Sequence, residues 1–285
     1  MTSLHDRALL LRSLHVPGRP LVLPNAWDVA SARLVEAAGA AAVATTSAGV
    51  AWSLGSADGD RLERDAALAL ISRIAAAVSV PVTADIESGF ARTPAELADT
   101  VRGGVLDAGA VGVNLEDSLR SGAHPLRRPA EQAAPITAAR SAADAAGVPL
   151  FLNARIDTHR LRPADRDSWL KETLDRARVY VEAGADGVFV LGTFDEATVS
   201  ALADGVPGPL NLLTGPGALP VPTLAKLGVA RVSAGSAIAE AAYALVDRSA
   251  RELLTTGTST TLADGLDHGT LNAAMPGGPA APPPA

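Results

Sequence analysis

Short apolar runs alternate with alanine-rich amphipathic stretches along most of the chain. The apolar runs have the length and the composition of buried β-strands. They cover residues 20–26, 40–49, 80–89, 110–117, 148–157, 186–193, 209–217 and 229–237. The stretches between them have helical spacing, and many end at a glycine, which can adopt the positive φ of a helix terminus. These predicted helices cover residues 27–38, 60–77, 93–108, 131–146, 168–183 and 194–203.

The alternation of strands and helices predicts an α/β fold with a parallel sheet, because parallel neighbours need a crossover connection. Eight such units in about 240 residues match a (β/α)8 TIM barrel in number and in length. A doubly wound open sheet is the alternative. It would be expected to carry a G-x-G-x-x-G turn after an early strand, and the first apolar run is not followed by one. The sequence therefore favours the barrel.

Both ends of the chain extend beyond these units. Residues 1–20 mix charged and apolar positions and lack a small-residue cleavage site, so they predict a first helix and not a signal peptide. The segment after the last strand is helical in pattern as far as residue 275, whereas the proline-rich tail 276–285 is predicted to be disordered. We expect a single barrel domain over residues 1–275, with additional N-terminal and C-terminal helices.

The segment 236–255 is longer than barrel closure requires. Its apolar residues recur at helical spacing and include Ile238, Ala241, Ala242, Leu245, Val246, Leu253 and Leu254. Such a face would stay exposed without a partner. The sequence therefore predicts a homo-oligomer, and the alternative is that the segment folds back on its own barrel.

Composition narrows the classes of partner and of chemistry. The chain is 48% hydrophobic but has no apolar run of the about 18 residues that span a membrane, so we expect a cytoplasmic protein without a membrane partner. A net charge of −7 argues against a nucleic-acid partner, which needs a clustered basic surface. Cysteine is absent, and the two lysines, Lys171 and Lys226, lie within helical patterns. Thiol and Schiff-base chemistry are thus disfavoured, which leaves carboxylates, arginine, histidine, hydroxyl groups or a metal.

Polar residues gather at the ends of the predicted strands, where a barrel of this type forms its active site. Asp85 and Glu87 share one side of the third strand, and Asn114 and Glu116 share one side of the fourth. Such acids repel one another unless a cation holds them, and hard oxygen ligands favour Mg²⁺, with Mn²⁺ as an alternative. Arg155, at the end of the fifth strand, could clamp a carboxylate or phosphate.

The turn 46–49 offers backbone N–H groups to an anionic oxygen. Together with the metal and the arginine, it describes a pocket for a small, doubly anionic 2-oxo acid. An enolate formed beside the metal would be stabilised there.

At these residues the chain resembles the isocitrate lyase/phosphoenolpyruvate mutase superfamily, in its mutase-like branch. The resemblance rests on the order and spacing of "LPNAWDVASARLVEAAGAAAVATTSAGVA", "VTADIESGF", "GVNLEDS", "LNARID", "LNLLTGPG" and "RVSAGSAIAEAAY". It implies C–C or P–C bond making or breaking next to a pyruvoyl enolate, with Mg²⁺. It also implies that the eighth helix is swapped between subunits in a dimer, and that dimers pair into tetramers.

The resemblance assigns a role to each candidate residue. Ser47, Ala48 and Gly49 match the substrate-binding loop, Asp58 matches an acid near the metal, Asp85 matches the direct metal ligand beside the substrate, and Glu87 and Glu116 match acids that hold metal-bound water. Arg155 matches the substrate-carboxylate arginine, and Asn211 matches a polar substrate contact. Asp58 and Glu116 are therefore candidate catalytic residues.

The chain departs from the superfamily in the loop after Asp117, "SLRSGAHPLRRP". Isocitrate and methylisocitrate lyases carry a Lys-Lys/Arg-Cys-Gly-His signature there; aligned without gaps, His124 takes the cysteine's position and is a candidate proton donor. Leu191 lies where those lyases place a substrate-binding glutamate, so a tricarboxylate lyase is disfavoured. The lysine of the phosphonomutase and phosphonopyruvate hydrolase branches is missing too. His159 is the other histidine within reach of the predicted site.

Three functions remain. The first is a Mg²⁺-dependent lyase that cleaves a C–C bond of a small 2-oxo or 2-hydroxy dicarboxylate, as in oxaloacetate decarboxylation. The second is a hydrolase of a C–C or P–C bond, with oxaloacetate or phosphonopyruvate as the substrate. The third is a barrel that binds carboxylates without catalysis.

Overall fold

The structure is a computed structural model that describes residues 3–119, 125–161 and 165–275. The described residues form one sheet of nine parallel strands, in the order β1-β9-β8-β7-β6-β5-β4-β3-β2. The strands are β1 (Leu21–Leu23), β2 (Asn25–Ala26), β3 (Val43–Thr45), β4 (Val82–Asp85), β5 (Gly112–Glu116), β6 (Phe151–Ile156), β7 (Gly187–Val190), β8 (Leu210–Leu213) and β9 (Arg231–Ser233).

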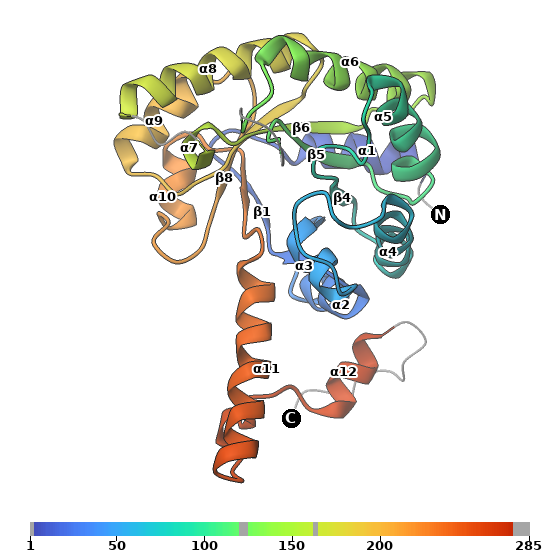
Figure 1. Cartoon of the computed structure of the whole chain (residues 1–285), viewed down its shortest axis with the longest axis vertical. Coiled ribbons are helices and arrows are strands. Elements are labelled where there is room, and N and C mark those ends of the chain that lie inside the picture. Colours follow the sequence, from blue (N-terminus) through green and yellow to red (C-terminus); the bar gives the residue numbers. More distant parts are fainter. Residues whose placement is uncertain (1–2, 120–124, 162–164, 276–285) are drawn as a thin grey trace.

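The sheet curls into a nearly closed barrel, as Figure 1 shows. Strand β1 pairs with β9, and β2 pairs with β3 at the other end of the strand order. Pro24 separates β1 from β2, so the first predicted run is divided into two short strands that share one barrel position. Proline has no backbone N–H to offer a sheet, which explains the break at this residue. The predicted TIM-like (β/α) barrel is confirmed.

Helices surround the sheet and connect successive strands (Figure 1). They are α1 (Leu4–Ser13), α2 (Val29–Ala37), α3 (Ser47–Ser53), α4 (Arg64–Ala77), α5 (Pro94–Thr100), α6 (Pro129–Ala145), α7 (Thr158–Leu161), α8 (Arg166–Glu182), α9 (Glu196–Gly205) and α10 (Val221–Lys226). The predicted helix 93–108 is α5 followed by a π-helical segment, η1 (Val101–Leu106). Local capping fixes several starts; for example, Asp28 Oδ1 accepts the N–H of Ser31 at 2.7 Å at the start of α2.

Helix α1 covers the N-terminal ends of the strands. A Cβ atom on Gly112, the first residue of β5, would lie 2.7 Å from Leu11 Cδ2, so the helix approaches the strand as closely as glycine allows. The ring of His15 stacks on Phe151, the first residue of β6, with centroids 3.6 Å apart. With this end of the barrel filled, the C-terminal ends of the strands remain open for a site.

After β9 the chain leaves the barrel as a projecting arm, shown in Figure 1. The arm consists of α11 (Ala237–Thr255), the 3₁₀ turn η2 (Thr260–Leu262) and α12 (His268–Ala274). It returns to the barrel at α2, where Arg33 Nε donates to the carbonyl of Ala274 at 2.7 Å. Exposed apolar side chains run along the arm: Ile238, Tyr243, Leu245, Val246, Leu253, Leu254, Leu262 and Leu266. No helix in the described part of the chain combines the length and apolar character needed to cross a membrane.

Candidate active site

A cavity of about 480 Å³ opens at the C-terminal ends of the strands. Five of the predicted site residues line it: Ser47, Ala48, Asp58, Asp85 and Arg155. They come from the first turn of α3, from the loop that follows α3, and from the ends of β4 and β6. The fold thus brings residues separated by more than a hundred positions to one cavity, as the strand-end argument predicts.

Acidic residues concentrate beside this cavity. Asp85 ends β4, where its N–H donates to Thr45 Oγ1 at 3.0 Å and its Oδ1 accepts the N–H of Glu87 at 3.1 Å. Glu87 has a φ of 52°, which turns the chain, and its carboxylate accepts the N–H of Asp60. Burial raises the pKa of Glu87 to about 8, and the negative charges of Asp60, Asp85 and Asp58 contribute to the rise. Burial also raises the pKa of Asp85, although the charge of Arg155 opposes it.

The donor set fits a divalent cation held largely through water. Within residues 3–119, 125–161 and 165–275, no three histidine or acidic side chains converge closely enough to hold one ion together. Asp85 nevertheless faces the cavity together with Asp58, whose Oδ1 is buried and accepts no hydrogen bond from the described residues. Mg²⁺ keeps several waters and often takes one or two carboxylates. Asp85 would contact the ion, with Asp58 and Glu87 close enough to stabilise its charge.

Arg155 is held rigidly by two buried acids. Its Nε and Nη2 donate to the two carboxylate oxygens of Asp157 at 2.7 and 2.9 Å, and its Nη1 lies 2.8 Å from Glu116 Oε2. Burial opposes the arginine's charge, but the nearby charges of Glu116, Asp157 and Asp85 outweigh it and raise the pKa of Arg155. The hydroxyl of Ser118 donates to Glu116, which fixes that carboxylate in turn. Arg155 is therefore a permanent cation with a fixed orientation at the cavity wall.

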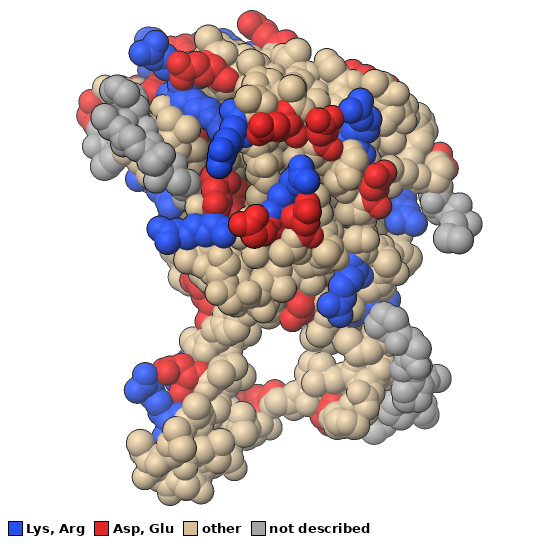
Figure 2. All heavy atoms as spheres, turned by 45° about the vertical axis from the view of Figure 1, so that its right-hand side comes forward, with Lys and Arg blue, Asp and Glu red and all other residues tan. Residues whose placement is uncertain are grey.

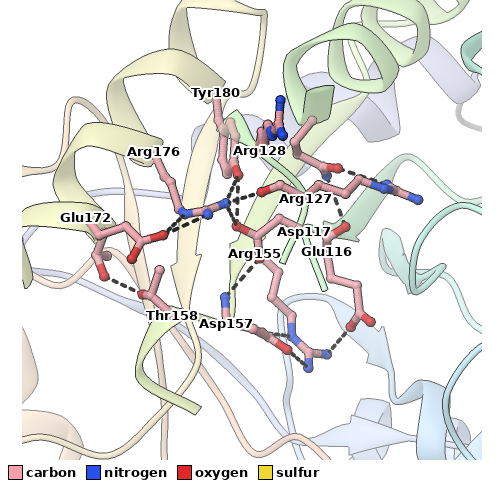
Figure 3. Close-up of polar contacts among 12 residues, drawn as sticks. Glu116, Asp117, Arg127, Arg128, Arg155, Asp157, Thr158, Glu172, Arg176 and Tyr180 are labelled. Atoms are coloured by element: carbon pink, nitrogen blue, oxygen red, sulfur yellow. Dashed lines mark hydrogen bonds and ion pairs between the residues drawn. The ribbon is translucent and has the colours of Figure 1, made fainter. Parts of the chain in front are cut away.

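A second buried network supports Asp157 from behind, as Figure 3 shows. The N–H of Asp157 donates to Asp117 Oδ1 at 3.1 Å. The other oxygen of Asp117, Oδ2, accepts from Tyr180 Oη at 2.8 Å and from Arg176 Nη1 at 3.0 Å. Burial raises the pKa of Asp117 to about 6, while Arg176 and Tyr180 lower it. Helix α8 thus helps to orient the segment that holds Arg155. Arg176 and Tyr180 lie within the predicted helix 168–183, and no local pattern marks them as site residues.

Below the cavity, amides from β5, β6 and β8 form a polar layer inside the barrel. Asn153 Nδ2 donates to Asn114 Oδ1 at 2.9 Å and to Asn211 Oδ1 at 3.0 Å. Arg231 Nη2 donates to Asn114 Oδ1 at 3.2 Å; because β9 and β5 are not neighbours, this contact crosses the barrel interior. Asn211, the predicted substrate contact, is 1% exposed and belongs to this layer, so it supports the cavity from beneath.

Three further predicted residues do not line the cavity. A Cβ atom on Gly49 would lie 2.7 Å from Trp27 Cβ, so this glycine permits close packing. Glu87 and Glu116 are both buried. The carboxylate of Glu87 accepts the N–H of Asp60, and the carboxylate of Glu116 pairs with Arg155. His124 lies outside the described residues. His159 packs between Trp169 and Phe194, with ring centroids 4.9 Å away in both cases.

Much of the remaining cavity wall comes from residues that the sequence pattern did not mark as site residues. Its apolar part includes Trp52, Phe189 and Leu213. Its polar part includes Arg160, Thr193 and Glu240. Arg160 follows Arg155 by five positions and was within reach of the strand-end argument, whereas Trp52 and Glu240 lie on helices whose orientation no local pattern specifies.

Comparisons with known proteins identify relatives of the chain. The family model of phosphoenolpyruvate phosphomutase matches residues 11–254. An uncharacterised protein of Mycobacterium tuberculosis (strain H37Rv) is 43% identical over 224 residues, covering 78% of this chain and 80% of the relative. The 2-methylisocitrate lyase of Escherichia coli (strain K12) is 31% identical over 237 residues, covering 81% and 78%.

Solved structures extend the likeness to the three-dimensional fold. A protein of Burkholderia cenocepacia J2315 assigned to the lyases or mutases is 37% identical, with a TM-score of 0.87 and coverage of 94% of this chain and 96% of that chain. A phosphonopyruvate hydrolase in complex with oxalate and Mg²⁺ is 25% identical, with a TM-score of 0.79 and coverage of 92% and 91%. The chain belongs to the phosphoenolpyruvate mutase family of the isocitrate lyase/phosphoenolpyruvate mutase superfamily.

Proposed function

We propose that this protein is a Mg²⁺-dependent lyase that cleaves a C–C bond of a small 2-oxo or 2-hydroxy dicarboxylate, releasing a pyruvate-type enolate. The observation that carries the proposal is the placement of Asp85 and Arg155 on one cavity. Arg155 would bind the substrate's 2-oxo-acid carboxylate, because its guanidinium is fixed by Asp157 and Glu116 before the substrate arrives. Asp85 would hold the cation next to the 2-oxo group. The cation would supply stabilisation of the negative charge that develops on that oxygen.

The cavity favours a small substrate. Leu191 lines the wall where the resemblance places a substrate-binding glutamate in tricarboxylate lyases, and Phe189 and Leu213 make the same wall apolar. A third carboxylate would lose its hydration there without a polar partner, which disfavours its binding. Oxaloacetate decarboxylation is the simplest reaction of the proposed class.

A hydrolase is the second candidate, with oxaloacetate or phosphonopyruvate as substrate. The likeness to a phosphonopyruvate hydrolase of known structure favours it. The two candidates share the metal, Asp85 and Arg155, and they differ in whether water attacks the bond that breaks. The reaction products therefore separate them.

Product analysis on a panel of 2-oxo and malate-type acids tests the proposal. We expect turnover of at least one dicarboxylate with Mg²⁺ or Mn²⁺, loss of turnover with EDTA, and a pyruvate-type or other 2-oxo product. Oxalate and acetate from oxaloacetate, or phosphate from phosphonopyruvate, would assign the hydrolase instead. Metal-dependent binding without turnover of any panel member would indicate a carboxylate-binding barrel.

We also propose that two copies of this chain exchange α11 to form a dimer, and that such dimers pair into a tetramer. An open groove of about 440 Å³ runs beside β1, lined by apolar residues that include Leu21, Val22, Pro24 and Val35. Val22 is 40% exposed although it belongs to a barrel strand. The arm meanwhile carries an exposed apolar face, and in Figure 2 the outer end of the arm is largely uncharged. The α11 helix of a second copy would cover both surfaces.

Light scattering at micromolar concentration checks this assembly. We expect a mass of two or four times 28.8 kDa. Val246→Glu, which places a charge on a side chain that is 65% exposed in the single chain, should dissociate the oligomer, because a charge is costly in an apolar interface. Arg248→Glu would serve as a matched control on the same helix. A monomeric wild-type protein would contradict the proposal.

A further inference from the structure

Two arginines face the cavity, and they are held very differently. Arg155 is 7% exposed, and its charge is matched by Asp157 and Glu116, both buried. Arg160, on α7, lines the same cavity with a side chain that is 44% exposed. In the described part of the chain, Arg160 Nη1 lies 3.3 Å from Asp157 Oδ2. That oxygen already accepts a shorter bond, 2.9 Å, from Arg155 Nη2.

Arg160 is therefore loosely held and has donors to offer. A guanidinium carries five N–H groups in a planar fork, and a single long contact to an oxygen shared with another arginine uses little of this capacity. The contact fixes the side chain near the cavity without neutralising it, because Asp157 is already paired with Arg155 in two hydrogen bonds. The cavity thus contains a fixed cation and a second, adaptable one.

The surroundings of Arg160 suit one anionic group. Phe189, Leu191 and Leu213 line the same cavity as Arg160, and an apolar wall strengthens an ion pair formed inside the cavity. The negative groups that line the cavity, Asp58, Asp85 and Glu240, do not pair with Arg160 in any contact of the described residues. A carboxylate, which is planar, matches the guanidinium fork in two parallel hydrogen bonds.

We propose that Arg160 binds the second, distal carboxylate of the substrate, and that this contact makes the enzyme selective for dicarboxylates over monocarboxylates. The inference rests on the proposed function, in which Arg155 and the cation hold the 2-oxo-acid end. The substrate then lies across the cavity between the metal end at Asp85 and the α7 end at Arg160. Arg160 determines specificity, and Arg155 and Asp85 bind the reacting end.

Calorimetry with three small acids tests this assignment in the presence of Mg²⁺. Malate and 2-hydroxybutyrate have the same chain length and differ at the distal end, where one has a carboxylate and the other a methyl group. Oxalate matches the 2-oxo-acid end of the substrate, has no carboxylate beyond it, and reports on the metal end. We expect the wild-type protein to bind malate more tightly than 2-hydroxybutyrate. Arg160→Gln should weaken the binding of malate by about tenfold to a hundredfold, the effect of losing a charge-assisted contact. The same substitution should leave the affinities for oxalate and 2-hydroxybutyrate within about twofold of the wild-type values.

Matched variants separate a direct contact from a general loss of charge. Arg160→Lys keeps the charge without the planar fork. Its affinity for malate should lie between those of the wild type and of Arg160→Gln. Arg178→Gln removes a charge from an exposed site on α8 that does not line the cavity, and it should change none of the three affinities.

The outcomes distinguish this inference from the proposed function. Equal weakening of malate and oxalate by Arg160→Gln would show that Arg160 acts through Asp157 and Arg155, and would overturn the distal-carboxylate assignment. An unchanged affinity for malate, or no preference of the wild type for malate, would overturn it as well. If the wild type also failed to bind oxalate with Mg²⁺, the proposed function itself would fall.

Discussion

Asp85→Asn is expected to abolish metal-dependent turnover while the fold remains intact. The substitution keeps the shape of the side chain and an oxygen that can accept the N–H of Glu87, a bond of 3.1 Å in the structure. It removes the charge that would hold a divalent cation on the cavity wall. Substitution of groups that only support a metal ligand costs about tenfold to a hundredfold, and loss of the ligand itself should exceed that. Turnover assays with saturating Mg²⁺ and calorimetry with oxalate measure both effects.

The unfolding temperature of this variant provides a control, because the direction of its change can be predicted. Because burial raises the pKa of Asp85 in the fold, its ionised form is disfavoured without a cation. Asp85→Asn should therefore unfold at the same temperature as the metal-free wild type, or at a higher one. Asp99→Asn, at an exposed position paired with Arg102, should change neither turnover nor metal binding. Full turnover in a folded, metal-replete Asp85→Asn protein would contradict the site assignment.

Arg176→Met is expected to lower the free energy of unfolding by about 3–5 kcal/mol, the usual cost of leaving a buried charge without its partner. Arg176 Nη1 lies 3.0 Å from Asp117 Oδ2, and the Asp117 side chain is fully buried. The same nitrogen donates to the carbonyl of Arg127 at 2.7 Å. Methionine preserves the apolar stem and supplies none of these bonds. Urea denaturation gives the free energy directly.

Two comparisons make this prediction specific. Arg178→Met, on the same helix, removes an exposed pair with Asp175 and should cost no more than about 0.5 kcal/mol. The double variant Asp117→Asn with Arg176→Met should recover part of the loss, since the unpaired charge is gone. A cost for Arg176→Met no larger than that for Arg178→Met would show that the buried network of Asp117 contributes little to stability.

The sequence by itself determined the class of fold and the rim on which the site lies. Apolar runs of strand length and helical spacing are local properties, and parallel strands joined by helices leave few arrangements besides a barrel. The residue at the end of each strand is likewise fixed by the strand's position in the chain. Asp85 and Arg155 could therefore be assigned to one rim from their positions in the chain alone, and the cavity contains both.

Tertiary structure decided which polar side chains face that cavity and which support it from behind. Glu116 lies at the end of β5 as predicted, yet its side chain pairs with Arg155. Asn211 is the second residue of β8, not its end, and its side chain belongs to the amide layer inside the barrel. The pairing of Arg176 with Asp117 joins residues 59 positions apart. Such a contact depends on how α8 packs against the barrel, which no pattern within either segment encodes. Contacts between elements arise from packing and register. For that reason the sequence located the site, whereas the tertiary structure determined which side chains line the cavity and which support it.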